Sequence, residues 1–173
     1  MSTFTALQDV IQHHFNGKAA ELQSFVKTGY SFEEWFNWEL FYALQVSESD
    51  LKPKPAYRHV TDLQASKKTG DVYFTKGGHS YIVEVALVHD YTSDKKWRDK
   101  VHWDRDQLLT LKGADKVIPI QLLVLVSNHD DMEASSDWMN WLKSLSFWGD
   151  AKDIQVKIRL PQNGQAWIVG WAV

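Results

Sequence analysis

The chain has 173 residues, of which 44% are hydrophobic and 24% charged, a composition that fits one globular domain and excludes a disordered or fibrous protein. Its 19 Lys and Arg residues against 22 Asp and Glu residues give a formal net charge of −3, so no overall positive field attracts nucleic acid or an anionic membrane. The absence of cysteine excludes disulfides, thiolate zinc sites and cysteine nucleophiles. The sequence contains neither the pattern of a signal peptide nor a run of about 18 apolar residues, so we expect a cytoplasmic protein that does not cross a membrane.

The first part of the chain is predicted to be helical. Apolar residues recur at helical spacing in the opening segment, and Asn16-Gly17 interrupts them, which predicts a helical hairpin or a broken helix. Ser31 and Glu34 have the spacing of a capping box and predict that a second helix begins there and covers about residues 32–46. The two prolines of residues 52–55 disfavour a helix and predict extended chain.

The rest of the chain is predicted to alternate between strands and helices. After the prolines the apolar residues recur with a period of two, which is typical of strands. The predicted elements are a weak strand at 57–64, a hairpin of strands at 71–75 and 80–88 with its turn at 76–79, a helix from a cap at 92–94 to Gly113, a very apolar strand at 117–127, a helix begun by Ser135 or Ser136, and strands at 154–160 and 166–173. This order predicts an α/β fold in which helices sandwich a mixed sheet.

One carboxylate stands out on the helix predicted at 32–46. In a helical projection Glu39 lies in the middle of a broad aromatic and aliphatic face, whereas Glu33 lies off that face. An ionised carboxylate among apolar side chains is costly unless a positive or hydrogen-bonding group meets it. We therefore expect Glu39 to have either a structural partner, such as an arginine or a backbone N–H, or a metal ion.

Two further carboxylates fall on the predicted hairpin. Asp71 follows Gly70 at the start of one strand, and Glu84 interrupts the apolar sequence of the next. An antiparallel hairpin with a short turn brings these positions to neighbouring strands, where two carboxylates need a cation or a shared proton. Because the chain has no cysteine, oxygen ligands favour Mg²⁺ or Mn²⁺ over structural zinc. The alternative for Asp71 is the common role of a turn residue at the entry to a strand.

Together these segments resemble the PD-(D/E)XK, or restriction endonuclease-like, nuclease superfamily. The resemblance rests on the following segments: a helix with Glu39, the sequence Gly70-Asp71-Val72-Tyr73-Phe74, the sequence Ile82-Val83-Glu84-Val85-Ala86, a helix with lysine and glutamine, and an apolar strand. It covers about residues 31–127 of a single domain of residues 1–173, in which the first helical segment and the last helix and strands are additions. It implies a restriction endonuclease-like fold and a site in which Glu39, Asp71 and Glu84 bind Mg²⁺ or Mn²⁺.

The chain departs from this family at one position. The family's lysine follows the strand glutamate by two residues, where this chain has Ala86. Phosphodiester hydrolysis needs a polarised water and a group that stabilises the charge developing on the phosphate. Lys100 and Gln107 lie on one flank of the next predicted helix, and the resemblance implies that they act beside Glu84 in place of the missing lysine. Alternatively, Lys100 belongs to a solvated flank or pairs with Asp104, four residues further along the helix.

Two functions follow from these patterns. The first is metal-dependent hydrolysis of nucleic acid, DNA in particular, with Glu84, Lys100 and Gln107 as catalytic residues and local lysines and arginines as a phosphate-binding rim. The second is a catalytically inactive member of the same fold that binds a protein partner, as a regulatory or immunity-type module, through exposed tryptophans. The acidic balance, Ala86 and the nine tryptophans favour the second function. The second function leaves the carboxylates unexplained, so we expect the nuclease function and keep the inactive module as the alternative.

Overall fold

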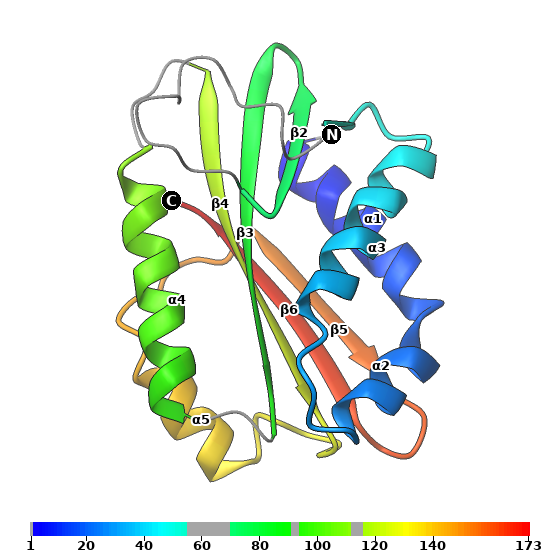
Figure 1. Cartoon of the computed structure of the whole chain (residues 1–173), viewed down its shortest axis with the longest axis vertical. Coiled ribbons are helices and arrows are strands. Elements are labelled where there is room, and N and C mark those ends of the chain that lie inside the picture. Colours follow the sequence, from blue (N-terminus) through cyan, green and yellow to red (C-terminus); the bar gives the residue numbers. More distant parts are fainter. Residues whose placement is uncertain (1, 55–69, 91–93, 112–115) are drawn as a thin grey trace.

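The computed structural model describes residues 2–54, 70–90, 94–111 and 116–173 (Figure 1). Its helices are α1 (Thr3–Asn16), α2 (Ala19–Val26), α3 (Glu33–Val46), α4 (Asp94–Leu109) and α5 (Ser136–Lys143). Its strands are β1 (Lys52–Lys54), β2 (Val72–Lys76), β3 (His79–His89), β4 (Val117–Ser127), β5 (Ile154–Arg159) and β6 (Gln165–Ala172). None of the helices in these ranges is long and apolar enough to span a membrane.

The described strands form one sheet in the order β1-β2-β3-β4-β6-β5. β3 and β4 are parallel, and every other neighbouring pair is antiparallel. A parallel pair needs a crossover, which α4 provides between β3 and β4. The expected mixed sheet is therefore confirmed.

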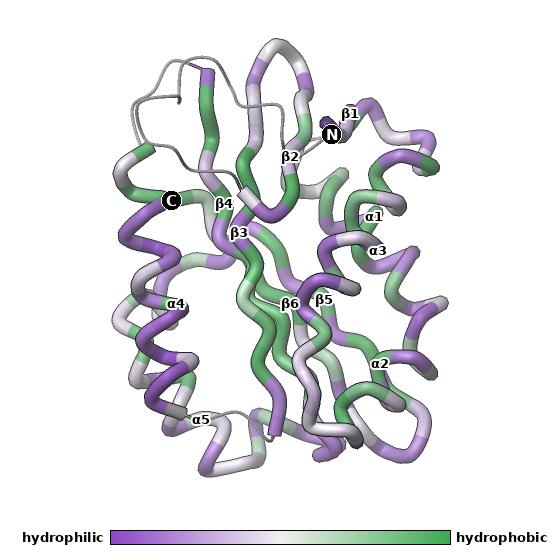
Figure 2. Tube along the Cα trace, in the orientation of Figure 1, coloured by the Kyte–Doolittle hydropathy of each residue, from purple (hydrophilic) through white to green (hydrophobic). Residues whose placement is uncertain are grey.

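The sheet lies between two layers of helices (Figure 1). The larger core cluster packs α1, α2 and α3 against one face, and a second cluster packs α4 and α5 against the other. Strands β3 and β4 are buried on both faces, which explains why their sequences are almost continuously apolar. In contrast, most residues of α4 are hydrophilic (Figure 2). Asp104 of this helix is buried, as are Glu84 and Gln121 of the sheet.

The observed elements agree with most of the predicted ones. The turn between β2 and β3 has Gly77 at φ 58° and Gly78 at φ 80°, conformations that glycine adopts at little cost. β1 is the extended chain expected from the prolines and pairs with β2. The strand expected at 57–64, the cap residues 92 and 93, and the helix end at Gly113 lie outside the described residues.

The predicted capping box is wrong. α3 begins at Glu33, its N-cap residue is Phe32, and no side-chain hydrogen bond caps it. Phe32 is buried and packs against the rings of Phe25 and Trp35, so apolar packing fixes the start of the helix. Glu33 is therefore the first residue of the helix, which begins one position later than predicted.

Candidate functional site

The edge of β3 facing β2 is only partly covered by that strand. Pairing begins with Val72 opposite Val83, so Asp71 and Glu84 occupy the adjoining positions of the two strands, as the hairpin predicted. Beyond Glu84, backbone N–H groups on this edge of β3 donate to side chains instead of to β2. The N–H of Val85 donates a hydrogen bond to Asp71 Oδ2 at 2.8 Å.

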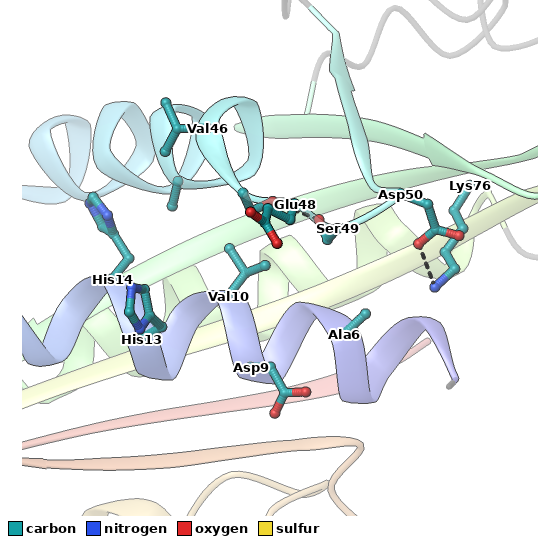
Figure 3. A pocket seen from close by; sticks show the side chains of 12 residues that line it. Ala6, Asp9, Val10, His13, His14, Val46, Glu48, Ser49, Asp50 and Lys76 are labelled. Carbon is teal, nitrogen blue, oxygen red and sulfur yellow. Dashed lines mark hydrogen bonds and ion pairs between the residues drawn. The ribbon is translucent and has the colours of Figure 1, made fainter.

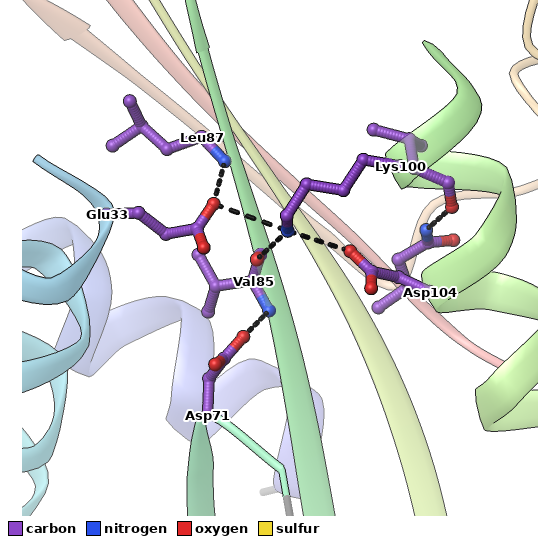
Figure 4. A network of polar contacts seen from close by, with 8 residues as sticks. Glu33, Asp71, Val85, Leu87, Lys100 and Asp104 are labelled. Carbon is purple, nitrogen blue, oxygen red and sulfur yellow. Dashed lines mark hydrogen bonds and ion pairs between the residues drawn. The ribbon is translucent and has the colours of Figure 1, made fainter. Parts of the chain in front are cut away.

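Glu33 completes this edge from the start of α3 (Figure 4). The N–H of Leu87 donates to Glu33 Oε2 at 3.1 Å. A buried backbone N–H without an acceptor is costly, so the two carboxylates of Asp71 and Glu33 replace the ladder bonds that a longer β2 would make. Both therefore have a structural role in holding the open edge of β3.

Lys100 reaches the same place from α4 (Figure 4). Its Nζ lies 2.9 Å from Asp104 Oδ2 and 3.4 Å from Glu33 Oε2, and it donates to the carbonyl oxygen of Val85 at 3.3 Å. The expected alternative, in which Lys100 pairs with Asp104 four residues later, is confirmed. We refer to Glu33, Asp71, Lys100 and Asp104 as the Lys100 cluster.

Glu39 lies outside this cluster. His14 Nε2 donates to its Oε2 at 2.6 Å, and Lys18 Nζ donates to its Oε1 at 3.2 Å. Both carboxylate oxygens thus face residues at the end of α1 and just after it. The expectation that Glu39 meets Asp71 and Glu84 is corrected: the partners of this partly buried carboxylate are two basic side chains.

Glu33 is the residue that sequence reasoning missed. Glu33 lies off the main apolar face of α3, as the helical projection predicts, whereas the expected site residue Glu39 lies on that face. The first turn of α3 contains two acidic residues, Glu33 and Glu34, so the pattern at the helix terminus does not single out Glu33. In the structure Glu33 is the glutamate of α3 that lies near Asp71 and Lys100.

Glu84 and Ala86 lie on the face of β3 that α4 covers. Alternation along the strand puts them with Ile82 and Val88, whereas Val83 and Val85 pack on the opposite face. Glu84 is buried, 6% exposed, and stands beside Gln121 of the parallel strand β4. Gln121 Nε2 in turn donates to the carbonyl oxygen of Val101 in α4 at 2.8 Å.

Gln107 is not part of the Lys100 cluster. It lies about 10 Å further along α4 than Lys100, since each helical residue adds about 1.5 Å. Its carbonyl oxygen accepts a hydrogen bond from the Thr110 hydroxyl at 2.6 Å. Its predicted catalytic role receives no support from this position, whereas Lys100 does lie on the flank that sequence analysis identified.

Family models, curated proteins and solved structures were compared with the chain. None of them matches it. The family resemblance therefore stays an expectation from the residues quoted in the sequence analysis.

The described carboxylates do not form a group suited to Mg²⁺ or Mn²⁺. Within the ranges that the structure describes, no three His, Cys, Asp or Glu side chains are grouped as metal ligands. The oxygens of Glu33 and Asp71 accept backbone N–H bonds, and Asp104 binds an ammonium group. We derive no catalytic step through a metal from this arrangement.

The environment shifts the pKa values of Glu33 and Lys100 in the same direction. Burial raises the pKa of Glu33, and the charge of Lys100 and the Leu87 hydrogen bond offset this only in part. Burial acts to lower the pKa of Lys100, but the hydrogen bond to Asp104 and the charges of Glu33, Asp104 and Asp71 outweigh it and raise that pKa. Lys100 therefore stays protonated at neutral pH, whereas Glu33 loses its proton less readily than an ordinary glutamate.

Glu33 and Glu39 allow a matched pair of substitutions on one helix. Glu33→Gln keeps an oxygen that accepts the Leu87 N–H and removes a carboxylate with a raised pKa, so we expect the free energy of unfolding at pH 7 to be unchanged or higher. Glu39→Gln removes a carboxylate whose pKa the hydrogen bonds from His14 and Lys18 lower despite burial. It should lower the free energy of unfolding by roughly 1–2 kcal/mol.

The pH dependence of the two effects separates them further. The stability from Glu39 is present above pH 4.5, the ordinary pKa of a glutamate, and is lost as the pH falls through its lowered folded-state pKa. For Glu33 the folded state binds the proton more tightly, so its ionisation costs stability as the pH rises above 4.5. Urea unfolding from acid to neutral pH measures both. A destabilisation by Glu33→Gln that grows with pH would contradict the raised pKa.

Proposed function

We propose that this protein has a restriction endonuclease-like fold and acts as a non-catalytic module that binds a protein partner. The order of elements supports this fold: α3 is followed by the antiparallel strands β1, β2 and β3, the crossover helix α4, and β4 parallel to β3. Asp71, just before β2, and Glu84 of β3 occupy adjoining positions, which agrees with the resemblance. The additions at both ends of this core, α1, α2, α5, β5 and β6, extend the sheet and its layers.

The observation that carries the non-catalytic function is the ion-paired state of Lys100. Its ammonium group contacts Asp104, Glu33 and the Val85 carbonyl, so its donors are directed at the protein. Two carboxylates contact this one ammonium, so Lys100 has no excess positive charge to meet a phosphodiester. At the strand position where the family has its lysine, this chain has Ala86, which supplies no cation.

A protein partner fits the surface better than a nucleic acid. Residues 33–50 include five acidic residues and no lysine or arginine, and Trp38 and Tyr42 are exposed on the same segment. Nucleic acid binding depends on neutralising phosphates with basic side chains. Exposed tryptophan and tyrosine side chains are typical of the energetically dominant positions in protein interfaces.

One specific observation favours the alternative, metal-dependent hydrolysis of nucleic acid. Glu33, Asp71 and Lys100 come from three separate elements and meet at one edge of β3. A glutamate, an aspartate and a lysine in proximity are the residue types that the resemblance assigns to a nuclease site. This function would require the carboxylates to adopt an arrangement different from the one described above.

One set of measurements separates the two functions. Purified protein is titrated with Mg²⁺ and Mn²⁺ by calorimetry, its Tm is measured with metal and with chelator, and plasmid DNA, single-stranded DNA and RNA are tested for cleavage. We expect no saturable binding, no cleavage and the same Tm in all conditions. A metal site filled at 100 times its Kd would add about 2.7 kcal/mol and raise Tm by several degrees.

The matched control for cleavage is Glu84→Gln, which keeps the shape of the side chain and removes its charge. Metal-dependent cleavage by the wild type that is lost in Glu84→Gln would overturn the proposal and establish the hydrolytic function. Cleavage that is equal in both proteins would indicate a contaminating nuclease, and the non-catalytic function would stand.

A further inference from the structure

A groove runs between α1 and the end of α3 (Figure 3). Its volume is about 820 Å³, which is large enough to accept several side chains of a partner. Apolar walls come from Ala6, Val10, Ala43 and Val46. Polar groups line the rest: Asp9, His13 and His14 of α1, Ser47, Glu48, Ser49 and Asp50 after α3, and Lys76 of β2.

An exposed apolar stripe on α3 continues this groove. Trp38, Tyr42 and Val46 are 72%, 56% and 56% exposed, and their spacing of four residues puts them on one face of the helix. Val46 lines the groove, and the Tyr42 ring makes an edge contact with the ring of His14, another lining residue, at 6.0 Å. We refer to the groove and this stripe together as the α1/α3 surface.

The α1/α3 surface is acidic. Asp9 and Glu48 are exposed in the groove. Of the described lining residues, Lys76 is the one lysine or arginine, and its Nζ lies 2.9 Å from Asp50 Oδ1. The surface thus combines exposed aromatic rings with the carboxylates of Asp9 and Glu48, and among the described lining residues the one lysine pairs with Asp50.

We propose that the α1/α3 surface binds a cationic, apolar segment of a partner protein, an inference that rests on the proposed protein-binding function. Lysine and arginine side chains of such a segment are attracted to the groove carboxylates and to the faces of Trp38 and Tyr42. Its apolar residues cover the exposed stripe, as an amphipathic helix covers a groove between two helices.

Charge excludes the main competing occupants. Nucleic acid and anionic membranes carry phosphates, which the exposed carboxylates repel. A second copy of the chain in a symmetric dimer would place this acidic surface against itself, because each partner of an isologous interface contributes the same patch. A basic segment is the occupant whose charge complements the surface.

The test uses a synthetic amphipathic peptide of about 18 residues, five helical turns, made of leucine and lysine. A second peptide has glutamate in place of every lysine and the same apolar face. Binding of each labelled peptide is measured by fluorescence anisotropy. We expect the lysine peptide to bind the wild type, to weaken as salt rises from about 50 to about 300 mM, and to bind much more tightly than the glutamate peptide.

Variants locate the binding surface. Trp38→Ala combined with Tyr42→Ala should weaken lysine-peptide binding at least tenfold, and Asp9→Asn combined with Glu48→Gln should reduce its salt dependence. Trp103→Ala is the matched control, because Trp103 is 58% exposed but belongs to α4 on the opposite face of the sheet. It should bind the peptide as the wild type does.

Four results would overturn the inference: no binding of the lysine peptide, equal binding of the glutamate peptide, unchanged binding by the Trp38 and Tyr42 double variant, or direct binding of labelled DNA to the wild type that this double variant loses. Light scattering tests a second copy as occupant, since a dimer that the double variant converts to a monomer would assign the surface to self-association. Each of these outcomes is independent of the metal and cleavage assays, so failure here is distinguishable from failure of the proposed non-catalytic function.

Discussion

Replacing Lys100 with alanine is expected to lower the free energy of unfolding by roughly 2–4 kcal/mol at pH 7, somewhat less than the roughly 3–5 kcal/mol for removing one partner of a fully buried ion pair, because the Lys100 side chain is 32% exposed. The side chain of Asp104 is 4% exposed and that of Glu33 is 20% exposed, so both carboxylates would lose their ammonium partner in a poorly solvated place. The Val85 carbonyl would lose a donor as well. Urea denaturation of both proteins measures the difference.

Lys96→Ala is the matched control, because Lys96 is exposed one turn earlier on α4. Its effect should stay within about 0.5 kcal/mol. Because the pKa of Lys100 is raised, its contribution is complete below pH 10.5 and is lost as the pH rises through its folded-state pKa. The Lys100→Ala variant should therefore lose less stability than the wild type does as the pH rises above 10.5. Equal stability of the two alanine variants would contradict a structural Lys100 cluster.

The same substitution also bears on the function. A catalytic lysine that contacts substrate contributes mainly to turnover, so its removal would leave the protein stable and slow cleavage. A lysine that joins α4 to β3 and α3 contributes mainly to stability. Lys100→Ala therefore gives opposite results under the two functions, even though sequence analysis identified the same residue for both.

The strands were the most predictable part of the fold. β4 occupies the predicted residues 117–127, since burial on both faces requires the continuous run of apolar residues seen there. The β2–β3 hairpin was predictable because Gly77-Gly78 permits the tight turn. The sequence therefore also predicted the neighbouring positions of Asp71 and Glu84, which depend only on this hairpin.

The glutamate of α3 could not be predicted in the same way. A helical projection identifies an apolar face but does not say which neighbour covers each part of it. α1 covers the part that contains Glu39 and supplies His14, whereas the start of α3 meets the open edge of β3 and brings in Glu33. Choosing between them requires the packing of α1 against α3, a long-range contact that no local pattern encodes.

The tryptophans also differ from the sequence expectation. Exposed tryptophans were expected to form an interface, yet Trp138, Trp141, Trp167 and Trp171 are buried, mostly in the core beneath α4 and α5. Among the tryptophans that the structure describes as strongly exposed are Trp38 and Trp103, on opposite faces of the sheet. The high aromatic content is thus mainly a property of the second core cluster, and only part of it is available for binding.

Trp171→Ala is expected to lower the free energy of unfolding by about 3–5 kcal/mol, the usual cost of truncating a buried aromatic side chain. Trp171 is 1% exposed, and its ring contacts Phe147 and Trp148 with centroids 5.2 and 6.0 Å apart. Lys152 Nζ also lies 5.6 Å from the ring. Urea denaturation followed by circular dichroism measures the loss without depending on tryptophan fluorescence.

Two further substitutions show whether this loss comes from packing. Trp171→Phe keeps an aromatic ring and removes a buried indole N–H that has no hydrogen-bond acceptor among the described residues, so it should cost much less than alanine. Trp38 is 72% exposed, so Trp38→Ala should change the free energy of unfolding by no more than about 0.5 kcal/mol. The same substitution should weaken binding of the lysine peptide. Equal stability losses at Trp38 and Trp171 would mean that the α3 stripe is part of the core. The α1/α3 surface would then be unavailable to a partner.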